Sequence, residues 1–168
     1  MIKLPPVARM FVVYVEGIGE IGTMEEFKPP ALEVKTENDS LNVADGEIAR
    51  DMGMAAMKWT AKFRDGSNIV LSFGLLNAAG TKIRCESALS GDSTTYTSDV
   101  HTIYGQITKF EQEAIKAGKQ TTYTVEGTAT YYQRVMGGIE LCCIDQLEPC
   151  RRINGVDQLE GARRAVGL

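Results

Sequence analysis

The stretch QTTYTVEGTATYYQRV, residues 120–135, decides the fold class of this 168-residue chain. Thr, Val and Tyr favour extended backbone, and successive side chains of a strand point to opposite faces. One face carries Tyr123, Val125, Gly127, Ala129, Tyr131 and Val135, and the other carries Gln120, Thr122, Thr124, Glu126, Thr128, Thr130 and Arg134. We therefore expect one long β-strand whose Tyr123, Val125 and Tyr131 face packs on the core.

A second long strand is predicted over Thr94–Phe110, which is rich in Thr, Tyr, Ile and Val but alternates poorly. The poor alternation indicates a β-bulge or a strand with two solvated faces. Both stretches exceed the five or six residues of an ordinary strand. We expect them to project beyond a small sandwich unless neighbouring copies of the chain pair with them.

Shorter strands complete the β pattern. The run Arg9–Val15 leads through a glycine turn into a predicted N-terminal hairpin. In Met54–Phe63 apolar and polar residues alternate, as in a half-buried strand. Gly137-Gly138 predicts a turn into a last strand over Ile139–Ile144.

Two helices are predicted. Ile69, Phe73 and Leu76 form one apolar stripe, and Gly80 would end that helix. A short C-terminal helix is expected from Gln158 to about Ala165, with Asp157 and Glu160 as a capping box. Its apolar side would dock through Leu159, Ala162 and Val166. The pattern predicts a single domain over residues 1–168: mainly β, sandwich-like or barrel-like, with one packed α-helix and a short C-terminal helix.

The net charge of −4 and the pI of about 5.1 argue against a nucleic-acid-binding protein, which needs clustered Lys and Arg. The four cysteines are Cys85, Cys142, Cys143 and Cys150, whose spacing matches no zinc module, so we expect reduced thiols and no metal. No apolar run reaches the length of a membrane helix, and the start lacks the pattern of a secretory signal. We expect no membrane anchor and a protein made in the cytoplasm.

The sequence offers no catalytic constellation. Its one histidine, His101, lies in a predicted strand without a recognisable nucleophile motif. Gly17-x-Gly19-x-x-Gly22 matches the dinucleotide pattern formally, but no helix follows it before Pro29-Pro30. We therefore expect neither an enzyme nor a cofactor.

Three motifs resemble the major tail tube proteins of contractile-tailed (myovirus) phages and R-type pyocins. The ending N-G-V-D-Q-L of residues 154–159, followed by Arg163-Arg164 and Gly167-Leu168, is the most specific. The others are P-x-L-x-x-K-T-E at residues 30–37 and D-M-G-M at residues 51–54. The resemblance covers nearly the whole chain, and its C-terminal motif, with an expected interface role, consists of Asn154, Gly155, Asp157, Leu159, Arg163 and Arg164.

The resemblance implies the phage tail tube fold and a structural subunit of the inner tail tube. Homo-hexameric rings would stack around a lumen, within a sheath, for DNA passage or envelope puncture. The implied partners are other copies of the chain, the sheath protein, the tape-measure protein and the baseplate, while DNA transits without specific binding. The implied location is the virion tail or a tail-like particle, assembled in the cytoplasm of the bacterial host.

Two sets of residues are candidates for assembly surfaces. We expect the lumen to be acidic and rich in threonine, and to be lined by Thr122, Thr124, Glu126, Thr128 and Thr130. The alternative, that this polar face lies in contact with solvent on the outside of the tube, is equally compatible with the sequence. Residues 36–50 are polar and show no clear periodicity, which predicts a functional loop. Contact of this loop with the adjacent ring is assigned to Thr36, Glu37, Asn38, Asp39, Asp45 and Glu47.

Alternative interpretations remain open at this point. A type VI secretion-like tube protein shares the broad fold, and the N-G-V-D-Q-L ending favours the phage branch over it. A lipocalin-like barrel would need eight regular strands around an apolar cavity, and fewer are predicted.

Overall fold

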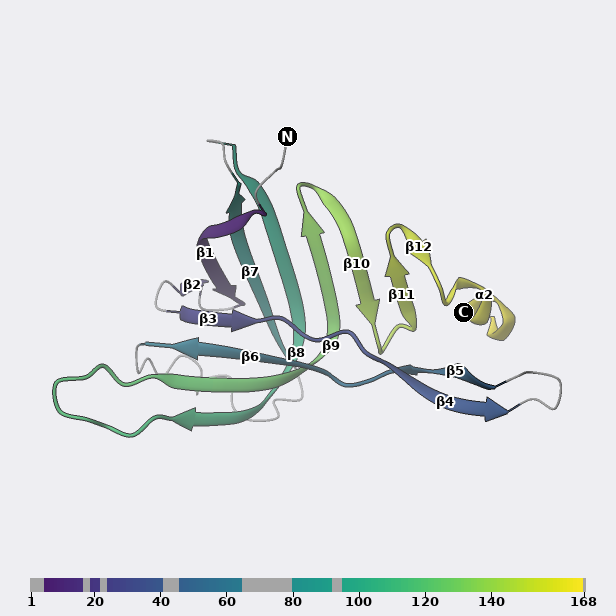
Figure 1. The fold of residues 1–168 in the computed structure, drawn as a ribbon, viewed down its shortest axis with the longest axis horizontal. Coiled ribbons are helices and arrows are strands. Elements are labelled where there is room, and N and C mark those ends of the chain that lie inside the picture. Colours follow the sequence, from purple (N-terminus) through teal and green to yellow (C-terminus); the bar gives the residue numbers. More distant parts are fainter. Residues whose placement is uncertain are drawn as a thin grey trace.

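The computed structural model describes residues 5–16, 19–21, 24–40, 46–64, 80–91 and 95–167, and antiparallel β-strands account for most of them (Figure 1). The elements are β1 Val7–Val15, β2 Gly19–Ile21, β3 Met24–Lys28, β4 Val34–Ser40, β5 Glu47–Met54, β6 Met57–Phe63, β7 Thr81–Ser90, β8 Thr97–Gln112, β9 Tyr123–Met136, β10 Ile139–Asp145, β11 Cys150–Ile153, β12 Val156–Asp157 and α2 Glu160–Val166. In this part of the chain no helix is long and apolar enough to cross a membrane.

The strands form two layers and a projecting ribbon. The broad layer follows the order β12-β11-β10-β9-β8-β7-β1-β2. The four-stranded layer consists of β3, β6, the first half of β9 and the second half of β8. In Figure 1 its strands run across those of the broad layer, and β4 and β5 leave it as a separate two-stranded ribbon.

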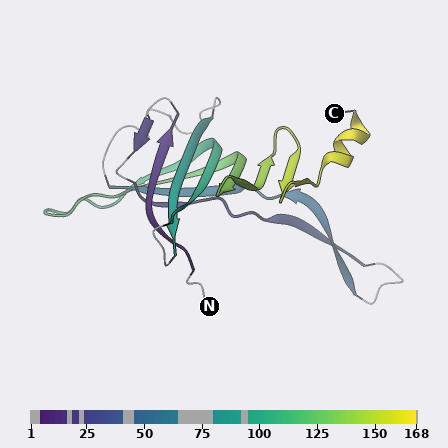
Figure 2. The ribbon, with the colours of Figure 1, turned by 90° about the horizontal axis from the view of Figure 1, so that it is seen from above.

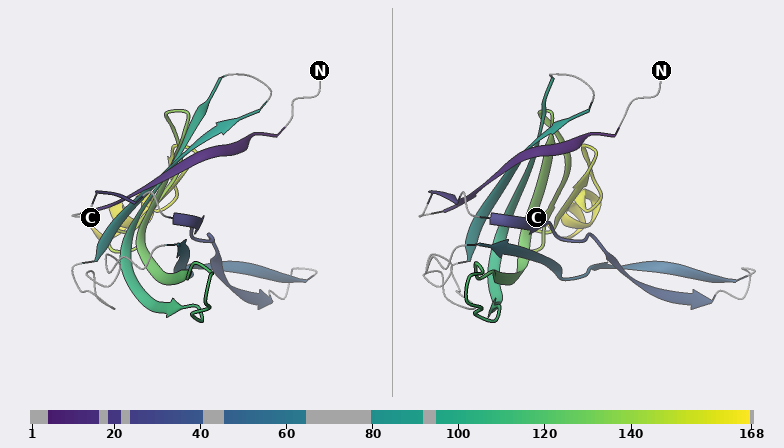
Figure 3. Two further views of the ribbon diagram at one scale, coloured as in Figure 1. Left: turned by 90° about the vertical axis from the view of Figure 1, so that its left-hand side faces the viewer. Right: turned by 60° about the vertical axis from the view of Figure 1, so that its left-hand side comes forward.

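The two long strands, β8 and β9, belong to both layers. Residues 97–105 of β8 pair with β7 in the broad layer, whereas residues 123–129 of β9 pair with β6 in the four-stranded layer. Two register shifts in the β8–β9 ladder, at Tyr104/Gly105 and Ile107/Lys109, mark where the pair bends from one layer into the other (Figure 3). The expected bulge is thus confirmed. Most of the 16 residues of β8 and of the 14 residues of β9 pair with other strands of the same chain.

Apolar side chains fill the space between the layers. The four-stranded layer contributes Met57, Trp59, Ala61 and Phe63, which confirms the alternation predicted for this strand. The broad layer contributes Val13, Val15, Ile83, Cys85, Ile103, Tyr132, Cys142 and Ile144. Met57 and Ile103 are completely buried, and burying a side chain of this size stabilises the fold by about 2 kcal/mol. The described residues therefore enclose a packed core and not the open ligand cavity of a lipocalin-like barrel.

Several predicted elements are confirmed and others need correction. The N-terminal hairpin pairs β1 with β2, and Gly137-Gly138 connects β9 to β10 with positive φ at both residues. The strand β7 was not predicted. The helix expected around Ile69, Phe73 and Leu76 lies outside the described residues.

The C-terminal helix begins later than expected. It covers Glu160–Val166, and the N-cap is Leu159, which makes no side-chain capping bond. The predicted capping box is therefore wrong, because Asp157 belongs to β12 and its carboxylate accepts hydrogen bonds from the backbone N–H groups of Arg151 and Leu159 instead. None of the helix residues is buried and Val166 is 73% exposed, so within the described part of this single chain the apolar side of the helix stays open, and its docking on another surface remains a prediction.

The four cysteines are free thiols. Cys142 faces the core cluster, whereas the thiol of Cys143 lies 3.7 Å from the hydroxyl of Tyr131 on the opposite face of the broad layer. The two neighbours thus point to opposite faces, as strand geometry predicts. Among the described residues, no group of His, Cys, Asp and Glu side chains is arranged to hold a metal ion.

Candidate assembly surfaces

The solvent-facing side of the four-stranded layer presents most of the predicted lumen residues together. In an antiparallel ladder, directly paired residues point to the same face. Thr124 pairs with Lys62, Glu126 with Thr60 and Thr128 with Lys58, so β6 and β9 contribute jointly to this surface. We call it the polar face; its members include Glu26, Lys28, Lys58, Thr60, Lys62, Gln106, Lys109, Glu111, Thr124, Glu126 and Thr128.

The charges of the polar face are nearly balanced. The ammonium of Lys62 lies 2.9 Å from Glu26, and that of Lys109 lies 2.6 Å from Glu111 and 3.6 Å from Glu126. The hydrogen bond and charge of Glu111 raise the pKa of Lys109. The described part of this face therefore carries lysines and glutamates in similar number. The sequence analysis expected an acidic lumen, whereas on this face the lysines of β3, β6 and β8, which join it through the tertiary pairing, offset the glutamates.

The polar face ends at a bulge in β9. Gly105 pairs with Ala129 and Tyr104 with Tyr131, so Thr130 is an extra residue, and its hydroxyl donates to the carbonyl of Tyr104 over 3.2 Å. Beyond it, Tyr132 is buried, while Tyr131 lies on the outer side of the broad layer. The predicted packing of Tyr131 on the core with Val125 is therefore wrong, because the bulge reverses which residues face inward. Thr122 comes just before β9, and its carbonyl accepts from the N–H of Glu113 over 2.9 Å.

The four-stranded layer has two outer strands. Within the described residues β3 pairs only with β6, and residues 106–112 of β8 pair only with β9. Such strands present backbone N–H and C=O groups that another chain can pair with.

The predicted loop over residues 36–50 is mostly a β-ribbon. β4 and β5 pair in antiparallel register, with Glu37 opposite Arg50 and Asp39 opposite Ile48. The sequence signal was missed because both faces of the ribbon are solvated, so apolar and polar residues do not alternate. Side-chain pairs hold the strands together: Asn38 donates to Glu47 over 2.8 Å and Arg50 lies 2.7 Å from Asp39. Asp45 lies outside the described residues.

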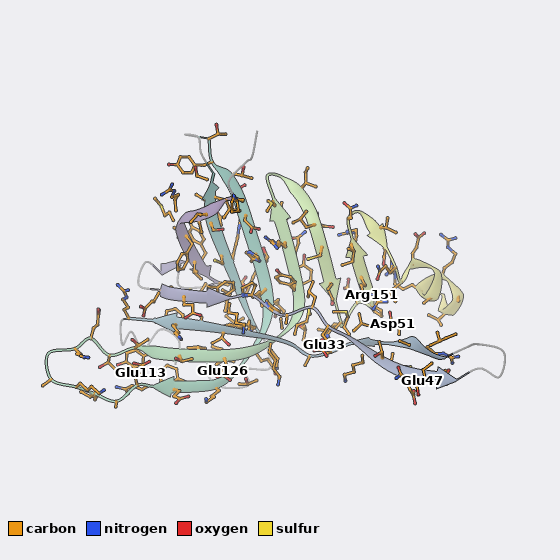
Figure 4. All side chains as sticks on the ribbon, viewed as in Figure 1. Glu33, Glu47, Asp51, Glu113, Glu126 and Arg151 are labelled. Carbon is orange, nitrogen blue, oxygen red and sulfur yellow. The ribbon has the colours of Figure 1, made fainter. Side chains whose placement is uncertain are left out.

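The base of the ribbon is attached to the broad layer. The guanidinium of Arg151 in β11 pairs with the carboxylate of Asp51 in β5, and the two face each other in Figure 4. The N–H of Ala55 donates to the carbonyl of Glu33 over 2.8 Å, and the amide of Gln146 donates to the carbonyl of Ala55 over 3.1 Å. The ribbon therefore projects from a fixed base (Figure 1).

A buried polar network lies between β8 and β9. Asp99 is 4% exposed and accepts two hydrogen bonds from Arg134, of 3.0 and 2.7 Å. His101 places Nε2 3.4 Å from Asp99 and Nδ1 2.9 Å from the Tyr132 hydroxyl. Burial lowers the pKa of His101. Burial alone would raise the pKa of Asp99, but Arg134 and His101 together hold it below its ordinary value. Because the polar residues Asp99 and His101 face inward, apolar and polar residues do not alternate regularly along β8.

The C-terminal motif forms a tight structure. Asn154 and Gly155 have φ of 49° and 78°, the combination required by a two-residue type I′ hairpin turn, and they connect β11 to β12. Arg163 pairs with Asp157 and, with a hydrogen bond from the Leu159 N–H, lowers the pKa of Asp157 to about 2. The motif positions therefore stabilise the C-terminal segment within the subunit, while Arg164 pairs with Glu160 in solvent.

Comparison with known proteins identifies the family of this chain. The family model for phage tail tube protein FII matches residues 5–167. The chain is 26% identical over 170 residues to the tail tube protein of Escherichia phage P2, which covers 98% of this chain and 99% of that protein.

Solved structures share the fold. A sheath/tube terminator of the extracellular contractile injection system PVC aligns with a TM-score of 0.60 at 13% identity, covering 81% of this chain and 99% of that one. The tube-terminating cap of the anti-feeding prophage aligns with a TM-score of 0.61 at 10% identity, covering 80% and 93%. A chain from the PVC sheath-tube complex aligns with a TM-score of 0.59 at 13% identity, covering 79% and 90%.

Proposed function

The chain belongs to the phage tail tube protein FII family and is a structural subunit of a contractile phage tail or tail-like tube, and from this premise we propose that its copies form stacked rings of six. The observation that carries the proposal is the four-stranded layer, which combines a polar face with two outer strands of unused pairing capacity. Joining β3 of one copy to residues 106–112 of β8 in the next would continue the sheet from subunit to subunit. Closing that sheet into a barrel removes its edges.

In this arrangement the polar face lines the lumen. On β9, Thr124, Glu126 and Thr128 alternate with the buried Val125, Gly127 and Ala129. Thr122 comes just before this strand, and Thr130 lies at the rim of that surface. Lys62 and Lys109 are engaged by carboxylates of the same surface, which limits their capacity to hold phosphate groups. DNA would therefore pass through the channel without specific binding.

The partners proposed for the tube are those of a contractile tail. A similar chain comes from a sheath-tube complex, which supports a sheath protein around the outside. A baseplate at one end and a tape-measure protein that sets the length complete the assembly, and assembly takes place in the cytoplasm of the bacterial host. The subunit would act without catalysis and without a cofactor.

Cysteine labelling of assembled tubes tests the orientation of the subunit. Glu126→Cys would be introduced into a Cys150→Ser background, because the other three cysteines are buried. Lys82→Cys, on the outer side of the broad layer, is the matched control. A bulky maleimide should label Lys82→Cys on intact tubes and label Glu126→Cys only after the tubes are dissociated. Rapid labelling of Glu126→Cys on intact tubes would show that the polar face lies outside.

A further inference from the structure

A small cavity separates β3 from the broad layer beside His101. It has a volume of about 170 Å³, and its walls are formed mainly by Ala8, Phe11, Phe27, Pro29, Cys85 and His101. The ring of Phe27 in β3 and the imidazole of His101 in β8 face each other, with their centroids 6.4 Å apart. The packing of β3 on the broad layer therefore depends in part on a contact with the one histidine of the chain.

This cavity lies where we expect the next copy of the chain to join. In Figure 1, β3 is the uppermost strand of the four-stranded layer, and β7, β8 and β9 of the broad layer extend above it. The β4–β5 ribbon and the hairpin of β8 and β9 extend away from this region in opposite directions (Figures 1 and 2). Joining β3 to residues 106–112 of β8 in the next copy would place the half-buried Phe110 of that strand, which faces the core with Val125, next to Phe27.

The polar groups around His101 carry no net charge while the imidazole is neutral. Asp99 and Arg134 form an ion pair, and Nε2 of His101 lies 3.4 Å from the same carboxylate. With the proton of the neutral ring on Nε2, that nitrogen donates to Asp99, and Nδ1 accepts from the Tyr132 hydroxyl over 2.9 Å. A second proton on Nδ1 gives the cluster one net positive charge and forces the Tyr132 hydroxyl to accept instead of donate.

In the described surroundings of His101, no further titratable group offsets that charge. Cys85 of β7 lies directly opposite His101, and Cys142 of β10 lies directly opposite Arg134. Burial raises the pKa of both thiols, that of Cys85 to about 12, so both are uncharged near neutral pH. The side chains that β1 and β3 contribute to the cavity are uncharged as well. A buried charge is costly until it is paired or hydrated, so an imidazolium at this position would draw water into the cavity.

We propose, on the basis of the proposed tube function, that His101 makes ring formation sensitive to pH. Proton uptake by His101 would bring water into the cavity and separate Phe27, and with it β3, from the broad layer. Because β3 is the strand that joins the next copy, the junction between copies would weaken while the core of the subunit remains folded. Histidine suits this role because its charge changes between about pH 5 and 8.

Rings should therefore be favoured at neutral pH and weakened in acid. Burial lowers the pKa of His101 below its ordinary value of 6.5 in the subunit, and covering the cavity with the next copy would lower it further. Between these two pKa values only the free subunit takes up the proton. The apparent dissociation constant of the junction should then rise by up to about tenfold per pH unit.

Sedimentation of the untagged protein from about pH 7.5 to about pH 5, at constant ionic strength, measures this dependence. Rings should dissociate as the pH falls, while circular dichroism shows folded subunits, and they should re-form when the pH is raised. His101→Gln keeps a hydrogen-bonding side chain but cannot take up the proton, so its rings should persist over the whole range. Glu86→Gln is the matched control and should behave like the wild type, because Glu86 lies on the outer side of the broad layer, 2.6 Å from Arg84.

The titration of His101 itself gives a second readout that needs no variant. Since the chain has one histidine, its imidazole resonances report this pKa by NMR below the ring-forming concentration, and rings should dissociate in the same pH range. The proposal is overturned, while the tube function stands, if wild-type rings persist to about pH 5, if they are lost only as the subunit unfolds, or if rings of His101→Gln dissociate like the wild type. A protein that forms no rings at any pH would instead overturn the proposed function.

Discussion

Arg151 of β11 pairs with Asp51 of β5 across 100 residues of sequence, and this pair joins the projecting ribbon to the body of the subunit (Figure 4). The Arg151 side chain is 11% exposed, whereas that of Asp51 is 46% exposed. The hydrogen bond from Arg151, supported by one from the Gly53 N–H, lowers the pKa of Asp51. The pair thus fixes the direction in which the ribbon leaves the four-stranded layer.

Replacing Arg151 by Met should loosen the ribbon without unfolding the core. The ribbon strands are exposed, and their amide protons should exchange faster when the base is released, whereas the amide protons of β6 and β9 should keep their protection. Hydrogen–deuterium exchange followed by mass spectrometry measures both regions in one experiment. Unchanged exchange over residues 46–54 would show that the pair does not hold the ribbon.

Replacing Arg134 by Met should destabilise the fold by about 3 kcal/mol, because Asp99 would lose its main partner while remaining buried. Urea unfolding measures the change in the free energy of unfolding. The double variant R134M/D99N should lose less than the sum of the two single variants, since each change removes the same interaction. Additive losses would mean that the two side chains do not stabilise each other.

Stability should fall below pH 6.5 because of His101, the one histidine in the chain. Burial lowers the pKa of His101 in the folded protein, so between its ordinary value of 6.5 and that lower value only the unfolded chain takes up a proton. The free energy of unfolding should therefore decrease by up to about 1.4 kcal/mol per pH unit in that window. Asp99 acts at lower pH: its stabilising effect is present above about pH 4 and is lost as pH falls through its depressed pKa.

Urea unfolding at a series of pH values measures this dependence. His101→Gln keeps a hydrogen-bonding side chain but cannot take up the proton, so it should flatten the slope just below pH 6.5. An unchanged slope in this variant would assign the titration to another group.

Gly127→Ala should destabilise the protein by about 2 kcal/mol. A Cβ at this position would lie 2.5 Å from the carbonyl oxygen of Gln106 and from the ring of Trp59, so the core would be overpacked. Gly161→Ala is the matched control, since its Cβ would have no neighbour within 4 Å and alanine favours the helix. Thermal unfolding should show a lower melting temperature for Gly127→Ala only. Equal melting temperatures would show that the layers can separate to admit the methyl group.

Local patterns predicted the elements that have one buried face. Met54–Phe63 alternates because β6 covers the core with every second residue, and the predicted turn at Gly137-Gly138 has positive φ at both glycines. These features depend on residues that are neighbours in sequence. They were therefore recoverable without the structure.

Features that depend on distant partners were not recoverable. The bulge at Thr130 reverses the orientation of Tyr131, and only the ladder between β8 and β9 reveals it. The inward-facing Asp99 is tolerated because Arg134 lies opposite His101 in the neighbouring strand. The solvated ribbon lacks alternation altogether, so its strands became evident only from their pairing. The nearly balanced charge of the polar face likewise arises from strands far apart in sequence.

Electron microscopy of the purified protein tests the central claim, that this chain builds a tube from rings of six. The account predicts six-membered rings, or hollow tubes made of stacked rings, in negative stain. Monomers that remain monomers at every concentration, even after sheath and baseplate proteins are added, would contradict it.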